Sequence, residues 1–222
     1  MKQLSEKDNL ERILPQLPLP LTGFGSLSEN YKKIEKIFET RSDFPDYESI
    51  YSEICTCLTF GLNQASITLT NHLLEKSLLI ALIYHEAFVN KDSKSHLDFN
   101  NYFVVEIEKY NNFTLELKID YCFEKQLISL EQKKELHEFR KNIRNGFSHS
   151  NLKKIFGNLN IDSQIISFEV NDIKVEEIKM DLWKSIFTQG LTQAAISEKI
   201  AANYFIYIDS IIRQLYNEIF KK

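Results

Sequence analysis

Leu73-Leu74-Glu75-Lys76-Ser77-Leu78-Leu79-Ile80-Ala81-Leu82-Ile83-Tyr84 is the most apolar stretch of the chain. It is short and contains Glu75 and Lys76, whereas a membrane-spanning helix needs roughly 20 apolar residues. We therefore expect no transmembrane segment. Between Leu78 and Ile83 almost no polar face remains, and a helix that is apolar on all sides is buried inside a bundle. The stretch predicts a long central helix over residues 64–90.

Helical periodicity continues on both sides of this segment. The helix predicted at residues 129–145 has the clearest boundaries, since Ser129 can cap it, Glu131 lies in its first turn and Gly146 can end it. A long apolar stripe also covers residues 181–222, with a break near Gly190. Four further helices are predicted at residues 28–40, 46–62, 100–110 and 115–128.

One segment departs from the helical pattern. Ile165–Val170 and Ile173–Glu176 are rich in β-branched residues and flank the polar pair Asn171-Asp172. Two such runs around a polar turn predict two short strands. We expect a small β-hairpin inserted between helices near residues 163–180.

The N-terminal residues 1–28 look different from the rest of the chain. A short helix is predicted over residues 5–14, and the prolines and glycines that follow indicate an extended, Pro-rich arm. With no internal repeat and no second composition, residues 1–222 are expected to form a single domain. The predicted fold class is all-α: an up-and-down helical bundle with one β-hairpin.

Composition limits the classes of function. With 6 Gly and 4 Pro in 222 residues, helices are favoured over a loop-rich β-fold. A net charge of −4 argues against a broad, non-specific coat for nucleic acid. Cys55, Cys57 and Cys122 lack zinc-site spacing, so we expect no metal, free thiols and a reducing compartment. Because the first residues carry no apolar run typical of a signal peptide, the expected location is the cytoplasm.

The strongest chemical signal is Arg144-Asn145-Gly146-Phe147-Ser148-His149. Arginine is permanently charged and suits phosphate oxygens, whereas histidine exchanges a proton near neutral pH. Gly146 can adopt a left-handed cap, which lets the chain fold back and bring His149 towards Arg144. An arginine and a histidine held together in this way fit metal-free phosphodiester chemistry.

Local charge also points to a phosphate ligand. Residues 131–154 contain seven basic and three acidic side chains, although the whole chain is acidic. A basic island on an acidic protein is typical of a phosphate-binding surface. The candidate substrate-binding residues in or beside it are Arg140, Lys141, Ser148 and Lys153.

The motif resembles the R-x4-6-H signature of the HEPN superfamily, including a polar residue directly after the arginine. The segment Leu73-Leu74-Glu75-Lys76-Ser77-Leu78 is similar to the acidic L-E-x-x-L segment of that superfamily's second core helix. The resemblance covers about residues 45–220 and implies a HEPN-like helical bundle. It further implies that Arg144 and His149 are catalytic, that Asn145 supports them, and that Glu75 orients Arg144.

What the resemblance implies about activity is a homodimeric, metal-independent endoribonuclease with no cofactor. Two motifs, one from each chain, form a composite cleft at the dimer interface. Such proteins occur in toxin–antitoxin, abortive-infection and CRISPR-linked antiviral defence systems, so an antitoxin or defence partner is expected. RNA cleavage through the 2′-hydroxyl gives 2′,3′-cyclic phosphate ends and leaves DNA intact.

Two other readings remain open. The chain could be a non-catalytic HEPN-like module that binds RNA, a nucleotide or a partner protein, or a purely structural helical dimer. An arginine and a histidine at this spacing also occur by chance as a surface pair. We expect His137, on the same predicted helix as Arg144, to face solvent.

Overall fold

The computed structural model describes residues 24–41, 45–90, 102–144, 160–169, 172–181 and 189–220, and the structural statements below concern these residues. Most of them are helical, which confirms the all-α class. The helix and arm predicted within residues 1–23 lie outside the described residues. No helix of the described ranges is long and apolar enough to cross a membrane.

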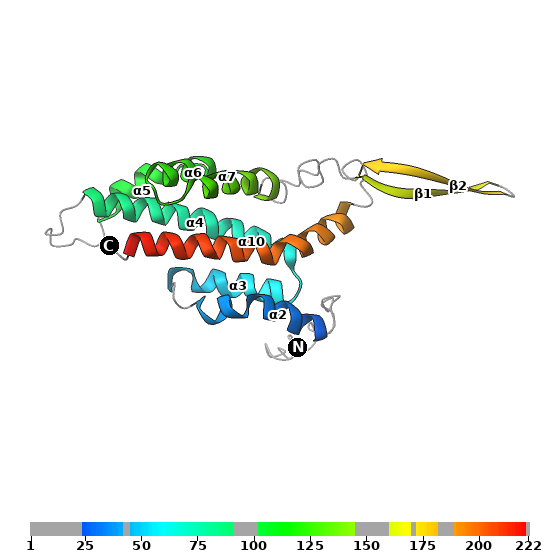
Figure 1. The fold of residues 1–222 in the computed structure, drawn as a ribbon, viewed down its shortest axis with the longest axis horizontal. Coiled ribbons are helices and arrows are strands. Elements are labelled where there is room, and N and C mark those ends of the chain that lie inside the picture. Colours follow the sequence, from blue (N-terminus) through cyan, green and yellow to red (C-terminus); the bar gives the residue numbers. More distant parts are fainter. Residues whose placement is uncertain are drawn as a thin grey trace, which may run out of the picture.

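The helices form three layers (Figure 1). The middle layer holds α4 (Asn63–Asn90) and α10 (Gln189–Phe220), which make the most extensive helix–helix contact among the described residues. On one side lie α2 (Phe24–Glu39), the short 3₁₀ turn η3 (Pro45–Tyr47) and α3 (Glu48–Thr59). On the other side lie α5 (Val104–Tyr110), α6 (Leu115–Glu124) and α7 (Leu130–Phe139).

Helix α4 is the predicted central helix, and its bounds agree with the predicted range to within one residue. Its side chains Leu73, Leu74, Leu78 and Leu82 are almost fully buried, as expected for a helix with neighbours on several sides. Helices α4 and α10 run in the same direction, because the Tyr204 hydroxyl donates a hydrogen bond to Asn71 Oδ1 (2.7 Å) while Ala81 and Leu215 line one small cavity. Packing therefore extends along both helices.

Some predicted boundaries are wrong. Helix α2 begins at Phe24 and includes Gly25, which the sequence had placed in the extended arm. Helix α6 ends at Glu124, before the predicted residue 128. Gln126 there has a φ of 60°, and the Leu127 N–H donates to the Cys122 carbonyl (2.9 Å). A residue in the left-handed region closes a helix in this manner.

Helix α10 begins at Gln189, whereas the sequence predicted a helix from residue 181. Asp181 instead ends strand β2 (Asp172–Asp181), which pairs antiparallel with β1 (Asn160–Glu169) from Asn160↔Asp181 to Glu169↔Asp172. Both strands overlap the range in which a hairpin was predicted, and together they extend away from the helices (Figure 1). Gly190 lies in the first turn of α10, so the expected interruption there marks the start of the helix.

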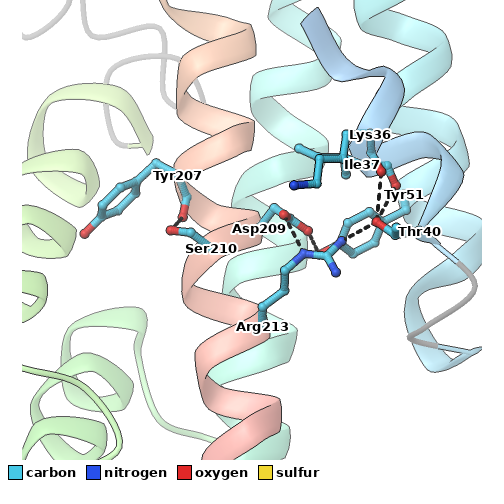
Figure 2. A network of polar contacts seen from close by, with 8 residues as sticks. All are labelled: Lys36, Ile37, Thr40, Tyr51, Tyr207, Asp209, Ser210 and Arg213. Carbon is cyan, nitrogen blue, oxygen red and sulfur yellow. Dashed lines mark hydrogen bonds and ion pairs between the residues drawn. The ribbon is translucent and has the colours of Figure 1, made fainter.

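A buried polar network joins α10 to α2 and α3 (Figure 2). Asp209, only 6% exposed, accepts hydrogen bonds from the Tyr51 hydroxyl (2.9 Å) and from Arg213 Nε (2.8 Å). Arg213 also donates to Thr40 Oγ1 at the end of α2 (2.7 Å). Burial, together with the charge of Asp209, raises the pKa of Tyr51 far above its ordinary value, so its hydroxyl stays a proton donor. We call these four residues the Asp209 network.

Candidate functional site

The segment that carries the predicted arginines begins with α7. Ser129 Oγ accepts from the Gln132 N–H (3.1 Å), and Gln132 Oε1 accepts from the Ser129 N–H (2.8 Å), which is a complete capping box. The predicted Ser129 cap is thus confirmed. Near its other end, Phe139 packs against Tyr204 and Tyr207 of α10, with ring centroids 5.2 Å and 5.1 Å away. Both ends of α7 are therefore firmly placed.

After Phe139 the helix changes to a π-helical turn, η4 (Arg140–Arg144). The sequence had predicted a regular α-helix to residue 145. π-turns are rare and occur frequently at functional sites, because the wider turn changes the direction in which the following side chains point. Both predicted arginines, Arg140 and Arg144, lie on this turn, which packs against α4.

Arg144 lies beside Glu75, the residue that the sequence analysis associated with it. An Nη atom of Arg144 is 3.9 Å from Glu75 Oε2, and both side chains are about one-third exposed, at 32% and 31%. The distance is at the outer limit of an ion pair and too long for a hydrogen bond. Glu75 therefore restrains the Arg144 guanidinium through charge, with loose geometry.

Lys118 on α6 is the closer partner of Glu75, and the sequence analysis missed it. Its Nζ is 3.2 Å from Glu75 Oε1, and its side chain is only 5% exposed. A signal was present, because Lys118 shares the apolar stripe of Leu115, Ile119 and Cys122 at helical spacing. A lysine on a buried stripe demands an acidic partner. We call Lys118, Glu75 and Arg144 the Glu75 cluster.

Other cations of the basic island are already paired. Arg140 contacts Glu116 of α6, with Nη2 3.0 Å from Oε1, and its buried Nε has no hydrogen-bond partner among the described residues. Lys133 contacts Asp120 at 2.7 Å. Lys141 is more than half exposed and only 3.9 Å from Glu138, so it is the more accessible cation. Acidic residues from α6 thus neutralise much of a charge that looked unopposed in the linear sequence.

The expectation that His137 faces solvent is wrong. Its side chain is 18% exposed, and Nε2 lies 3.1 Å from Asp120 Oδ1. Burial by itself raises the pKa of Asp120, but hydrogen bonds from Lys133 and His137 outweigh it and hold that pKa below its ordinary value. His137 helps to join α7 to α6 and points away from the role of a free proton carrier.

The remaining predicted site residues, Asn145, Ser148, His149 and Lys153, lie outside the described residues. Where the structure does describe side chains, no three His, Cys, Asp or Glu residues come together in a group that could hold a metal ion. Cys55, Cys57 and Cys122 are free thiols, and burial raises the pKa of Cys55 to about 12, which makes it a poor nucleophile.

Comparison of the chain with models of protein families, with curated proteins and with solved structures found no match. The functional argument therefore rests on the motif and on the geometry around Arg144.

Proposed function

We propose that this chain is a HEPN-like helical protein that cleaves RNA without a metal. The single observation that supports this most is the placement of Arg144. It lies on a π-helical turn directly before the rest of the R-N-G-F-S-H motif and is only loosely tethered to Glu75, at 3.9 Å. A guanidinium held in position but not saturated is suited to accept a phosphate oxygen.

In the proposed reaction the RNA 2′-hydroxyl attacks the adjacent phosphorus, and the bond from phosphorus to the 5′-oxygen breaks. His149 of one chain accepts the 2′-hydroxyl proton, and His149 of a second copy supplies a proton to the leaving oxygen. Such proton transfers each contribute roughly 10²–10⁴-fold. Arg144 neutralises charge that develops on the phosphate, with Asn145 as its polar support. The reaction needs two copies of the motif in one cleft, so the proposal includes a homodimer.

The ion pairs around η4 shape how RNA binds. A phosphate must take the place of Glu75 at Arg144, or of Glu116 at Arg140. Charged pairs of this exposure are individually weak, about 1 kcal/mol or less, so the exchange is feasible. We therefore propose binding to a few defined phosphates, with Lys141, Ser148 and Lys153 as further contacts, and no broad electrostatic coat.

The proposed setting is prokaryotic defence or a toxin–antitoxin pair in the cytoplasm. This part rests on the motif resemblance alone. A toxin of this class requires a partner that restrains it, so we include an antitoxin or defence partner in the proposal.

The decisive experiment is a cleavage assay on a mixed RNA pool in EDTA, with product ends mapped. Wild type, His149→Ala and Arg144→Ala are compared with His72→Ala, which removes an exposed histidine from α4. We expect cyclic-phosphate ends from wild type and His72→Ala, and cleavage lost in the other two. Absence of cleavage by folded wild-type protein, or a chain that stays monomeric at micromolar concentration, contradicts the proposal.

A second candidate is a non-catalytic HEPN-like module that binds RNA, a nucleotide or a partner protein. The pairing of Arg140 with Glu116 at 3.0 Å favours it, because it leaves a less basic surface than a nuclease cleft usually presents. Binding of RNA that survives His149→Ala, is lost in Arg144→Ala and is never followed by cleavage distinguishes this candidate from the first.

A further inference from the structure

We infer that Lys118 is a positioning residue that holds Glu75 back from Arg144 and so keeps the guanidinium available to a phosphate group. This inference rests on the proposed function for its consequence in RNA binding. Its structural part concerns only the three side chains of the Glu75 cluster and can be tested without any activity.

The distances decide which cation has the stronger hold on Glu75. Lys118 Nζ is 3.2 Å from Oε1 and within hydrogen-bonding distance, whereas the Arg144 Nη is 3.9 Å from Oε2. One carboxylate is thus shared unequally between two cations that approach different oxygens. Since interaction energy falls with distance and a charged hydrogen bond adds to it, Lys118 is the primary partner.

Burial acts in the same direction. The Lys118 side chain is 5% exposed, so water cannot solvate its ammonium group if Glu75 turns away. Leaving a buried charge without its partner is strongly unfavourable. The Arg144 side chain is 32% exposed and can be hydrated or can bind an anion instead. The ligand that replaces Glu75 at Arg144 therefore leaves the Lys118–Glu75 pair intact.

The elements that carry the three residues explain why the arrangement persists. Glu75 lies between the buried Leu74 and Leu78 on α4, and Lys118 lies beside the buried Ile119 on α6. Cys122, one turn beyond Lys118, donates from Sγ to the Leu78 carbonyl at 3.8 Å, which keeps α6 against α4. Arg144, by contrast, ends the described part of η4. The carboxylate and lysine are fixed by the core, and the arginine is the adjustable member.

The test begins with Lys118→Met, which removes the charge but keeps an apolar side chain of similar length. With its nearer partner lost, Glu75 acts on Arg144 alone. We expect phenylglyoxal to modify Arg144 about two- to fivefold more slowly, which corresponds to the usual strength of a partly exposed ion pair. Peptide mass spectrometry measures this rate. The RNA KM should rise by a similar factor with kcat unchanged, because the competition affects binding alone.

Two further variants separate positioning from a merely structural role. Lys118→Met/Glu75→Gln removes the competing carboxylate, so the Arg144 modification rate should return at least to the wild-type value. Lys109→Met is the matched control, because Lys109 pairs with Glu86 on the same helix α4 but far from Arg144. It should leave the Arg144 rate unchanged, and thermal unfolding confirms that each variant is folded.

An Arg144 rate that does not change in Lys118→Met, or that stays slow in the double variant, overturns the inference. If Lys118→Met does not fold, Glu75→Gln alone decides it: Arg144 must then react faster than in wild type. The expected modification pattern without RNA cleavage by wild type supports the inference about Lys118 and contradicts the proposed nuclease function. The two failures are therefore distinguishable.

Discussion

Two carboxylates on the neighbouring central helices, Asp209 of α10 and Glu75 of α4, each connect to side chains from other elements, but they do so differently. Asp209 is 6% exposed and both its oxygens accept short hydrogen bonds, from Tyr51 (2.9 Å) and Arg213 (2.8 Å). The Glu75 side chain is 31% exposed, with one close cation, Lys118, and one distant cation, Arg144. The first arrangement is saturated, and the second leaves one cation able to exchange partners.

The difference separates stability from function. A buried acid with both oxygens satisfied cannot release a partner without stranding a charge, so the Asp209 network serves to hold α2 and α3 on α10. A half-exposed acid at 3.9 Å from an arginine contributes little stability, and its partner can accept a new ligand. Four expected outcomes, from the largest to the smallest effect on stability, can break or sharpen this comparison.

Asp209→Ala should have the largest effect. It leaves Arg213 and the fully buried Tyr51 hydroxyl without their acceptor. Removal of one member of a buried charged pair typically costs about 3–5 kcal/mol of unfolding free energy. Urea denaturation followed by circular dichroism measures it, with the exposed Glu218→Ala on the same helix as control. Equal loss in both variants would show that the Asp209 network does not hold the fold together.

Glu86 should give the next largest effect, and one that depends on pH. Burial by itself raises its pKa, but hydrogen bonds from Lys109 and Tyr110 and the charge of Lys125 lower the pKa from 4.5 to about 2. A carboxylate with a lowered folded-state pKa stabilises above its unfolded pKa, and this contribution disappears as the pH falls through the folded value. We therefore expect about 2 kcal/mol to be lost between about pH 5 and 2.

The check is unfolding free energy against pH for wild type and Glu86→Gln. The variant should show a shallower decline over this pH window and lower stability at pH 7. Curves of identical shape for both proteins contradict the assignment of the lowered pKa to Glu86.

Arg144→Ala should change stability by only about 0–1 kcal/mol, because its pair with Glu75 is long and partly exposed. Under the proposed function it should nevertheless abolish RNA cleavage. The same urea titration, run beside the cleavage assay, tests both expectations. A stability loss as large as that of Asp209→Ala would erase the distinction between the two carboxylates.

Replacement of residues 160–181 by a short Gly/Ser linker should have the smallest effect. Asn160 and Asp181 are paired across the ladder, so a few residues can close the gap, and the strands extend away from the helices (Figure 1). Shortening a connection changes the unfolding free energy by about 1 kcal/mol. A thermal midpoint many degrees below wild type would show that the strands stabilise the helical layers. Unchanged stability with lost RNA binding would assign the strands a role in recognition.

Sequence reasoning predicted most elements that depend on local pattern. The central helix was found to within one residue because its apolar run is uninterrupted over several turns, and the Ser129 cap because capping is a local hydrogen-bond arrangement. The association of Glu75 with Arg144 came from a motif, and the structure brings the two within 3.9 Å. Their roles in catalysis stay predictions.

The misses share a cause. The π-turn η4, the start of α10 at Gln189 and the pairing of His137 with Asp120 all depend on neighbours far along the chain. A basic island read from consecutive residues was likewise incomplete, since Glu116 and Asp120 come from a different helix, α6.

By itself, then, the sequence determined a helical protein built around one apolar helix and placed an R-N-G-F-S-H motif after its best-capped helix, because periodicity and capping act within a few residues. Only the tertiary structure decided which charges meet: Lys118 with Glu75, and Asp209 with Tyr51 and Arg213. The physical reason is that an ion pair depends on distance and burial, and both arise when separate helices pack.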